Sequence, residues 1–112
     1  MRGNFIQVLA CSVVFVGLIA SCTELSQAES GGETFKSTCA ACHGPDGKGT
    51  VRMGRILGAA DLTAAGVQSQ SDAQLIDVIT NGKKKMPPFD GQLTKEQITG
   101  LVAYIRQLGK KD

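Results

Sequence analysis

The sequence contains no tryptophan and few other aromatic residues: four phenylalanines and one tyrosine in 112 residues. It also contains only one histidine, three methionines and three prolines. A chain of this length forms one domain at most. A small domain with so few aromatic side chains buries little apolar surface and usually needs a covalent or metal staple. Large enzymes and multidomain receptors are therefore excluded, and the nature of the staple becomes the main question.

Apolar residues are concentrated near the N-terminus, where residues 5–21 carry no charge and Arg2 is the only charged residue before them. A charged start followed by a short apolar run is typical of a secretory signal. The run only just reaches the ~17 residues that a membrane-spanning helix needs. We therefore expect the chain to be exported to the periplasm rather than retained in the membrane by this segment.

Two cleavage sites fit this signal. Residues 19–22, Ile-Ala-Ser-Cys, resemble the bacterial lipobox, in which Cys22 is acylated and becomes the mature N-terminus. Several acyl chains on Cys22 would hold the protein stably at a membrane surface. Residues 26–28, Ser-Gln-Ala, instead fit a conventional signal peptidase, which would release a soluble protein. The expected organisation is a signal peptide at 1–21 (alternatively 1–28), a polar tether at 22–30 and a folded domain at 31–112.

The four cysteines do not suggest a disulfide framework, because Cys11 lies within the signal and Cys22 is either removed or acylated. The other two, Cys39 and Cys42, belong to a C-x-x-C-H run that ends at His43. This pattern is typical of c-type haem attachment. Thiols three positions apart reach the two vinyl groups of one porphyrin, and the adjacent imidazole approaches the iron from the same turn. We therefore expect two thioethers to one haem c, with the histidine as proximal ligand.

Other interpretations of the same pattern have less support. A thioredoxin-like redox pair needs a βαβ context, and no strand-rich segment precedes Cys39. A structural zinc site needs four ligands, but His43 is the only histidine and no further cysteine remains in the mature chain. A chance match is opposed by the export signal, because bacteria attach haem c outside the cytoplasm.

The methionines are the candidates for a second axial ligand, because His/Met ligation raises the reduction potential of an electron carrier. Met1 is lost with the signal, and Met53 lies only ten residues after His43. Met86 lies 43 residues after His43 and is followed by two prolines, which stiffen an extended loop. An isolated methionine is more often a core residue, but this lysine- and proline-rich segment is not typical of a core. Met86 is therefore the predicted distal ligand.

The rest of the chain predicts short helices joined by glycine-rich loops, with no alternating strand pattern. A first helix is expected from about Gly32 to Cys42, followed by a turn at 44–49. Residues 50–70 are expected to be loop, with a single helical turn at 59–63. The fold class is all-α.

Two further helices carry start and stop signals. Ser71 with Gln74 predicts a capping box that opens a helix ending at Asn81-Gly82. Thr94 with Gln97 repeats this signature before a final helix that ends at Gly109. The apolar residues of that final helix recur at i, i+3, i+4 and i+7: Ile98, Leu101, Val102 and Ile105.

With these motifs the sequence resembles class I c-type cytochromes over about residues 31–109. The resemblance rests on the C-x-x-C-H run, the glycine-rich turn after it, Met86-Pro87 and the final helix. It implies a cytochrome c-like fold of three to four short helices wrapped around one covalent haem, with long glycine-rich loops. It also implies that the first and last helices cross closely, and the matching residues here are Gly32, Phe35 and Tyr104.

One feature departs from the family. Many members place a proline in the loop after the haem motif, and the carbonyl of that proline accepts the histidine Nδ1–H. This chain has no proline between Pro45 and Pro87. A backbone acceptor for His43 is still expected, and we place it near residues 55–57.

The net charge selects no partner, because removing Arg2 with the signal leaves the basic residues only one in excess of the acidic ones. Lys83, Lys84 and Lys85 directly precede the predicted methionine ligand, and in the family this loop borders the exposed haem edge. They are expected to form either a docking patch for an acidic redox partner or an ordinary solvated loop. The sequence has no broad basic face with interleaved aromatic residues, so nucleic-acid binding is not expected.

The expected function is that of a monomeric one-electron carrier, not an enzyme, because two filled axial positions leave no site for a substrate. One alternative is a haem-bearing subunit of a larger oxidase or dehydrogenase, which the sequence does not separate from a free carrier. Another is a haem enzyme or gas sensor with a displaceable methionine. Arg52 and Arg55 are candidates to pair with the haem propionates.

Overall fold

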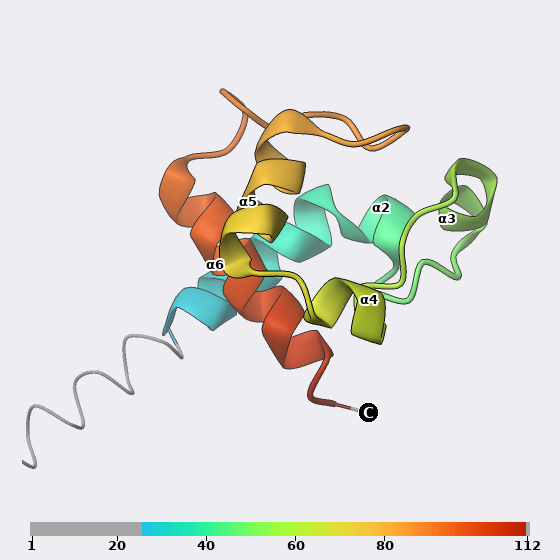
Figure 1. Cartoon of the computed structure of the whole chain (residues 1–112), viewed down its shortest axis with the longest axis horizontal. Coiled ribbons are helices and arrows are strands. Elements are labelled where there is room, and N and C mark those ends of the chain that lie inside the picture. The colour runs from blue at the N-terminus through green and yellow to red at the C-terminus, as the bar shows by residue number, and fades with distance from the viewer. Residues whose placement is uncertain (1–25, 112) are drawn as a thin grey trace, which may run out of the picture.

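The computed structural model describes residues 26–111, so the predicted signal peptide and Cys22 lie outside the described residues. In this part of the chain, residues 26–38 are helical, and five labelled helices follow (Figure 1). They are α2 (Ala40–His43), α3 (Arg52–Leu57), α4 (Ala65–Gln68), α5 (Asp72–Asn81) and α6 (Lys95–Leu108). Residues 26–111 contain no strand and only two isolated bridges. The predicted all-α class is confirmed.

Both predicted capping boxes are present. Ser71 Oγ accepts a hydrogen bond from the Gln74 backbone N–H at 3.1 Å, and Gln74 Oε1 accepts one from the Ser71 N–H at 2.9 Å. Thr94 and Gln97 form the same reciprocal pair at 3.1 and 2.8 Å. Each box satisfies two backbone N–H groups that the start of a helix leaves without an intrahelical partner. Helices α5 and α6 therefore begin and end where the sequence predicts, each followed by a glycine.

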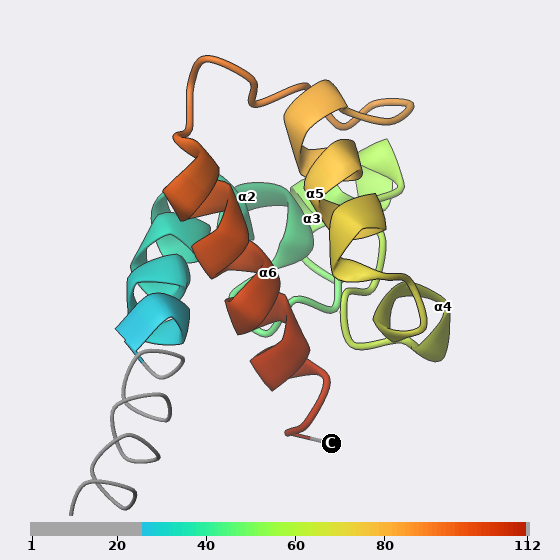
Figure 2. The same ribbon diagram turned by 60° about the vertical axis from the view of Figure 1, so that its left-hand side comes forward.

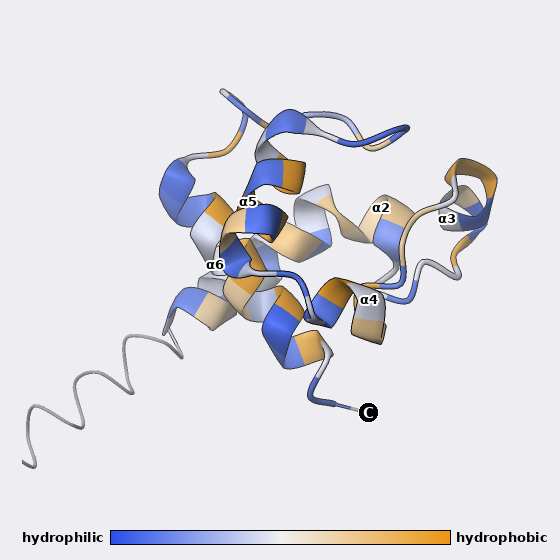
Figure 3. Cartoon of the chain, in the orientation of Figure 1, coloured by the Kyte–Doolittle hydropathy of each residue, from blue (hydrophilic) through white to orange (hydrophobic). Residues whose placement is uncertain are grey.

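Helix α6 supplies most of the core. Its apolar stripe faces inward while its opposite face is hydrophilic, as the hydropathy colouring shows (Figure 3). Phe35 from the helix of residues 26–38 and Leu101 from α6 are fully buried. Burying side chains of this size contributes about 1.5–3 kcal/mol each. The core consists of Phe35, Leu75, Ile79, Ile98, Leu101, Val102, Ile105 and Leu108.

The helix of residues 26–38 crosses α6 at close range (Figures 1 and 2). The Phe35 and Tyr104 rings lie 5.2 Å apart at an interplanar angle of 48°, and a Cβ on Gly32 would lie 3.1 Å from the Tyr104 ring. The predicted contact of these three residues is confirmed. A tighter contact was not predicted: a Cβ on Gly31 would collide with the carbonyl group of Gly100. The backbones of the two helices therefore approach more closely than any side chain would allow.

The N-terminal helix includes residues 26–30, which the sequence analysis assigned to a tether. Ala28 is only 3% exposed, and the carbonyl oxygen of Gln27 lies 3.1 Å from the Cβ position of Gly100. This end of the helix is thus part of the packed domain. The polar composition of residues 26–30 gave no sign of this packing, because one small alanine and two glycines are enough for the contact.

The segment 50–70 also differs from the expected loop. It contains α3 and α4, and in place of the helical turn expected at 59–63 it has a single hydrogen-bonded turn, closed by the Ala64 N–H and the Asp61 carbonyl oxygen at 3.3 Å. Neither helix has a side-chain N-cap, since Val51 and Ala64 occupy the cap positions. Without a capping residue or an apolar period, the sequence carried no local signal for either helix. None of the helices among residues 26–111 is long and apolar enough to cross a membrane.

Candidate functional site

An apolar cavity opens between the helix of residues 26–38, the segment 60–70, α5, α6 and the loop after α5. It contains about 700 Å³ of space free of protein atoms, counting its open mouth. Only three of the residues that line it are polar: His43, Gln70 and Lys83. The others are Phe35, Cys39, Ala60, Leu62, Val67, Leu75, Val78, Ile79, Met86, Leu101 and Ile105. Concave, mostly apolar walls with a few polar groups are typical of a cofactor site.

The C-x-x-C-H run occupies one short turn at the edge of this cavity. Cys39 lies between the N-terminal helix and α2, and its carbonyl oxygen accepts a hydrogen bond from the His43 N–H at 2.9 Å. Cys39 and His43 line the cavity. Cys42 lies on the same turn, half-buried, but is not one of the lining residues. Both cysteines are free thiols, so the structure contains no competing disulfide between them.

The environment of Cys39 keeps its thiol uncharged. Burial at the apolar wall raises the pKa of Cys39 to about 11, and the nearby Cys42 adds a smaller contribution in the same direction. A buried thiolate would need a positive partner or strong donors, and the apolar wall offers none. Conversion of this thiol to a thioether would leave an uncharged group in an uncharged wall.

The imidazole of His43 is oriented by a backbone carbonyl. Its Nδ1 lies 3.0 Å from the carbonyl oxygen of Ala60. A carbonyl only accepts hydrogen bonds, so Nδ1 carries the proton and Nε2 keeps its lone pair for a metal. The prediction of a backbone acceptor is confirmed, but its location at residues 55–57 was wrong. Those residues belong to α3, which ends at the left-handed Gly58, and the chain returns to the histidine only at Ala60.

Met86 reaches the cavity from a tight turn. The Lys83 and Met86 backbones exchange two hydrogen bonds, of 3.1 and 3.0 Å, and the turn needs positive φ at Gly82 (77°) and Lys84 (55°). A further backbone bond of 3.0 Å, from the Phe89 N–H to the Ile79 carbonyl oxygen, ties the loop to α5. Met86 packs against the core and lines the same cavity as His43. The structure therefore brings together two residues separated by 43 positions.

The alternative methionine lies elsewhere. Met53 is on α3 with 47% of its surface exposed, and it does not line the cavity. Arg52 and Arg55 are also exposed on α3 and are not cavity-lining residues, so nothing in the structure supports their pairing with propionates. Ile56, 59% exposed, completes an apolar pair with Met53 on this short helix.

The three lysines before Met86 are all exposed. Lys83 is at the mouth of the cavity, while Lys84 and Lys85 occupy the middle of the turn, which forms the hydrophilic tip of this loop (Figure 3). One of the three exposed lysines therefore reaches the cavity wall, and the other two follow it directly in the same turn.

These donors fit one haem c. The Cys39 thiol, the His43 imidazole and the Met86 thioether line the apolar cavity, and the Cys42 thiol lies on the same turn as Cys39. These are the groups that attach and ligate such a haem. Among residues 26–111, no group of three or more His, Cys, Asp and Glu side chains lies together in a way that could hold a bare metal ion. The zinc interpretation is thus unsupported in the described part of the chain.

Sequence reasoning missed one wall of the cavity. Leu62, Val67 and Gln70 line it, yet they lie in a segment without periodicity, where no local pattern marks a residue as buried. The hydrogen bond from Gln68 Nε2 to the carbonyl oxygen of Leu62, 2.7 Å, helps to fold this segment onto the cavity.

Comparison with known proteins agrees with this geometry. Residues 26–105 match the family described as cytochrome C oxidase, cbb3-type, subunit III. The chain is 36% identical to cytochrome c6 of Nostoc sp. over 112 residues, which covers all of this chain and 96% of the relative. It is 34% identical over 89 residues to the cbb3-type cytochrome c oxidase subunit CcoP of Azospirillum brasilense, covering 78% of this chain but 30% of that subunit.

A solved structure shares the fold. The KustC0563 c-type cytochrome superposes with a TM-score of 0.64 at 34% sequence identity. The match covers 70% of this chain and 95% of that protein.

Proposed function

The chain belongs to the class I c-type cytochromes, which carry one covalently bound haem c, and from this premise we propose that Cys39 and Cys42 hold the haem while His43 and Met86 ligate its iron. The protein is a haem c electron carrier. The observation that best supports the ligand assignment is the position of His43 and Met86, which line one cavity from distant parts of the chain. Met53, half-exposed outside that cavity, has no comparable position.

The bound haem supplies one-electron chemistry, cycling between Fe(II) and Fe(III). The residues around it set the conditions for that transfer. The Nδ1–H of His43 is bound to Ala60, which fixes the ring and raises the basicity of Nε2. Met86 is held by its turn, and a thioether ligand in an apolar wall favours the reduced state. With His43 and Met86 as the two iron ligands, no position would be left for a substrate, so we propose a carrier that is not an enzyme.

Export with processing at Cys22 is the proposed route to the periplasm. The packing of the N-terminal helix supports this site over the alternative after Ala28. Cleavage there would remove Ala28, which is 3% exposed, and Gln27, whose carbonyl lies against α6. Cleavage before Cys22 keeps the whole helix of residues 26–38.

A lipid on Cys22 would hold the domain close to a membrane. Three residues, 23–25, separate Cys22 from the first described helical residue. An extended chain spans at most ~3.3–3.6 Å per residue, so the link is short. Mass spectrometry of the mature N-terminus tests the proposal, with an acylated Cys22 expected. An unmodified N-terminus at Glu29 would overturn it.

Lys83, Lys84 and Lys85 are proposed as the docking patch for an acidic redox protein, and the carrier itself is proposed to be a monomer. The patch is exposed, and its first residue, Lys83, lines the cavity. Reversing all three charges to glutamate should slow electron transfer to the partner, and the effect should shrink at high salt. Reversing Lys95, Lys110 and Lys111, which are exposed on or after α6, is the matched control. Equal rates in both triple variants would refute the patch.

A second candidate function follows from the family match and from the relative CcoP, named as a subunit of a cbb3-type oxidase. The chain would then serve as the haem-bearing subunit of a larger complex. Purification from membranes in mild detergent distinguishes the two, because a subunit co-purifies in fixed stoichiometry with oxidase polypeptides, whereas a carrier is recovered alone.

A reduced-minus-oxidised spectrum of the exported protein tests the function most simply. A c-type α band is expected, and the haem should remain with the polypeptide after denaturation because it is covalently attached. Carbon monoxide should not bind promptly to the reduced protein at neutral pH, because Met86 fills the sixth position. Absence of the α band would reject the haem assignment, and prompt carbon monoxide binding would instead favour a haem enzyme or gas sensor.

A further inference from the structure

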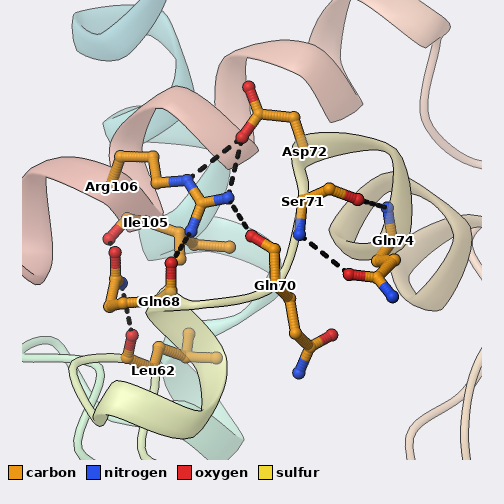
Figure 4. A network of polar contacts seen from close by, with 8 residues as sticks. All are labelled: Leu62, Gln68, Gln70, Ser71, Asp72, Gln74, Ile105 and Arg106. Carbon is orange, nitrogen blue, oxygen red and sulfur yellow. Dashed lines mark hydrogen bonds and ion pairs between the residues drawn. The ribbon is translucent and has the colours of Figure 1, made fainter.

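Arg106 connects α6 to the wall of the cavity that the sequence analysis missed (Figure 4). Its Nη1 donates to the carbonyl oxygen of Gln68 at 2.8 Å, and its Nη2 donates to the carbonyl oxygen of Gln70. Nε and Nη2 also donate to Asp72 Oδ1, at 3.1 and 2.8 Å. One guanidinium thus binds the end of α4, the linker after it and the first residue of α5.

Gln68 extends this network in the opposite direction. Its Nε2 donates to the carbonyl oxygen of Leu62 at 2.7 Å and to that of Ile105 at 3.0 Å. The side chain lies directly against Gly109, where a Cβ would collide with it. Both ends of the segment 62–70 are therefore anchored to the last two turns of α6.

Hydrophobic burial accounts for only part of the contacts that hold this wall. Helix α4 contributes no fully buried residue, and Leu62 and Val67 are only partly buried where they pack against the core. Leu62, Val67 and Gln70 nevertheless line the cavity. The hydrogen bonds from Arg106 and Gln68 therefore help to keep these three residues against the site, together with the bond of 2.8 Å from the Leu62 N–H to the Gly47 carbonyl oxygen.

The ion pair is the lesser part of the network. The Asp72 side chain is 70% exposed, and solvent screens such a pair strongly. The bonds to the carbonyl oxygens are partly buried, and hydrogen bonds from a charged donor are the stronger kind. The planar fork of the guanidinium reaches several acceptors at fixed angles, which a lysine cannot reproduce.

We propose that Arg106 is a positioning residue for the haem site: by binding the Gln68 and Gln70 carbonyls, it holds the wall of residues 62–70 closed and keeps water from the haem. Burial of the haem raises its reduction potential, because water stabilises the additional charge of the oxidised iron. Loss of the Arg106 hydrogen bonds to these carbonyls should therefore lower the potential without changing an iron ligand. This inference rests on the haem site proposed above.

The test compares the midpoint potential of holoprotein variants. Arg106→Met removes the hydrogen bonds to the Gln68 and Gln70 carbonyls but leaves Asp72 unpaired, and the negative charge of Asp72 would by itself also lower the potential. The double variant Arg106→Met/Asp72→Asn removes both charges, and its potential is expected to stay below that of the wild type. Asp72→Asn alone keeps the carbonyl bonds and should not lower the potential. Lys95→Met removes a positive charge from the exposed start of the same helix and is the control for net charge.

A second readout follows the wall directly. Amide hydrogen exchange in residues 62–70 should become faster in the double variant, while exchange in the first turns of α6 should not change. If the double variant yields no holoprotein, Arg106→Lys, which keeps the charge but not the fork, takes its place and is expected to show the same two changes in smaller size.

The proposal would be overturned if the double variant had the same midpoint potential as the wild type, even if its thermal stability fell. The same holds for Arg106→Lys where that variant replaces the double variant. Such a result would assign Arg106 a structural role only. The wild-type and variant spectra separate this outcome from a failure of the haem assignment, because a missing c-type α band in the wild type would reject the site itself.

Discussion

His43 Nδ1 and the carbonyl oxygen of Ala60 lie 3.0 Å apart, although the two residues are seventeen positions apart in the sequence. Gly49 lies directly behind this carbonyl. A Cβ at Gly49 would lie 2.7 Å from the Ala59 carbonyl oxygen and 3.3 Å from that of Ala60. Gly58 has the same φ of +69° but open space around its Cβ position. Substitutions at the two glycines therefore distinguish the effect of backbone strain from the effect of displacing the carbonyl that accepts from His43.

Gly49→Ala should push the Ala59–Ala60 segment away and weaken the bond to His43. The imidazole then becomes a weaker base, the oxidised iron is less stabilised, and the midpoint potential should rise. Gly58→Ala should cost about 1–2 kcal/mol of stability through its left-handed φ without changing the potential. Potentiometry and the NMR signal of the His43 Nδ1–H check both. Equal shifts in the two variants would show that strain alone is responsible.

Gly31→Ala should strongly destabilise the holoprotein, because the new Cβ would collide with the backbone of α6 at Gly100. Overpacking against a backbone that cannot move costs about 1–3 kcal/mol. Gly66→Ala is the matched control: nothing lies within 4 Å of its Cβ position in α4, and alanine is favoured over glycine by about 0.8–1 kcal/mol in a helix. Chemical denaturation measures both, and similar losses in the two variants would argue against the close crossing.

Lys84 is the only non-glycine residue among 26–111 with positive φ. Its left-handed conformation costs about 1–2 kcal/mol, so Lys84→Gly should stabilise the holoprotein by about 0.5–1 kcal/mol once the greater freedom of unfolded glycine is counted. Lys85→Gly removes the same charge at ordinary φ and should destabilise by about 0.5–1 kcal/mol. Loss of stability in both variants, measured by chemical denaturation, would contradict the strained turn.

The pKa of Asp61 lies below its usual value, first because Thr63 Oγ1 donates to it at 2.6 Å and next because the Thr63 N–H donates at 2.9 Å. A carboxyl with a lowered folded-state pKa stabilises the fold above its unfolded pKa of about 3.9, and this stabilisation is lost as the pH falls through the folded-state pKa. Thr63→Val should therefore raise the pKa of Asp61 and reduce the pH dependence of stability in that acid range. NMR titration of Asp61 measures it, with Thr99→Val on α6 as the control. An unchanged pKa in Thr63→Val would reject the hydroxyl as the main cause.

Local chemistry explains which parts of the fold were predictable. The Ser71 and Thr94 capping boxes act within four residues, so the sequence marks α5 and α6 directly. The C-x-x-C-H turn and the proline-stiffened Met86 loop are also local patterns. That His43 and Met86 would lie in one cavity was predicted from the chemistry of haem ligation, not from a local sequence pattern.

Long-range contacts explain what was missed. Arg106 binds Gln68, Gln70 and Asp72, which precede it by 34 to 38 positions in the chain. No short window of sequence shows such a pairing. The contact of Gly31 with Gly100 likewise depends on how two helices cross. Helix α3 has Val51 at its N-cap, and neither capping nor periodicity predicted it. Because residues 55–57 belong to this helix, the acceptor for His43 is Ala60 instead.

The weak ferric charge-transfer band near the red edge of the visible spectrum, which reports methionine sulfur bound to iron, tests the central claim most directly. It should be present in the wild type, absent in Met86→Ala and retained in Met53→Ala, where the removed side chain lies half-exposed outside the cavity. A band that survives in Met86→Ala would contradict the account, because the proposed ligation of the iron depends on Met86 as the distal ligand.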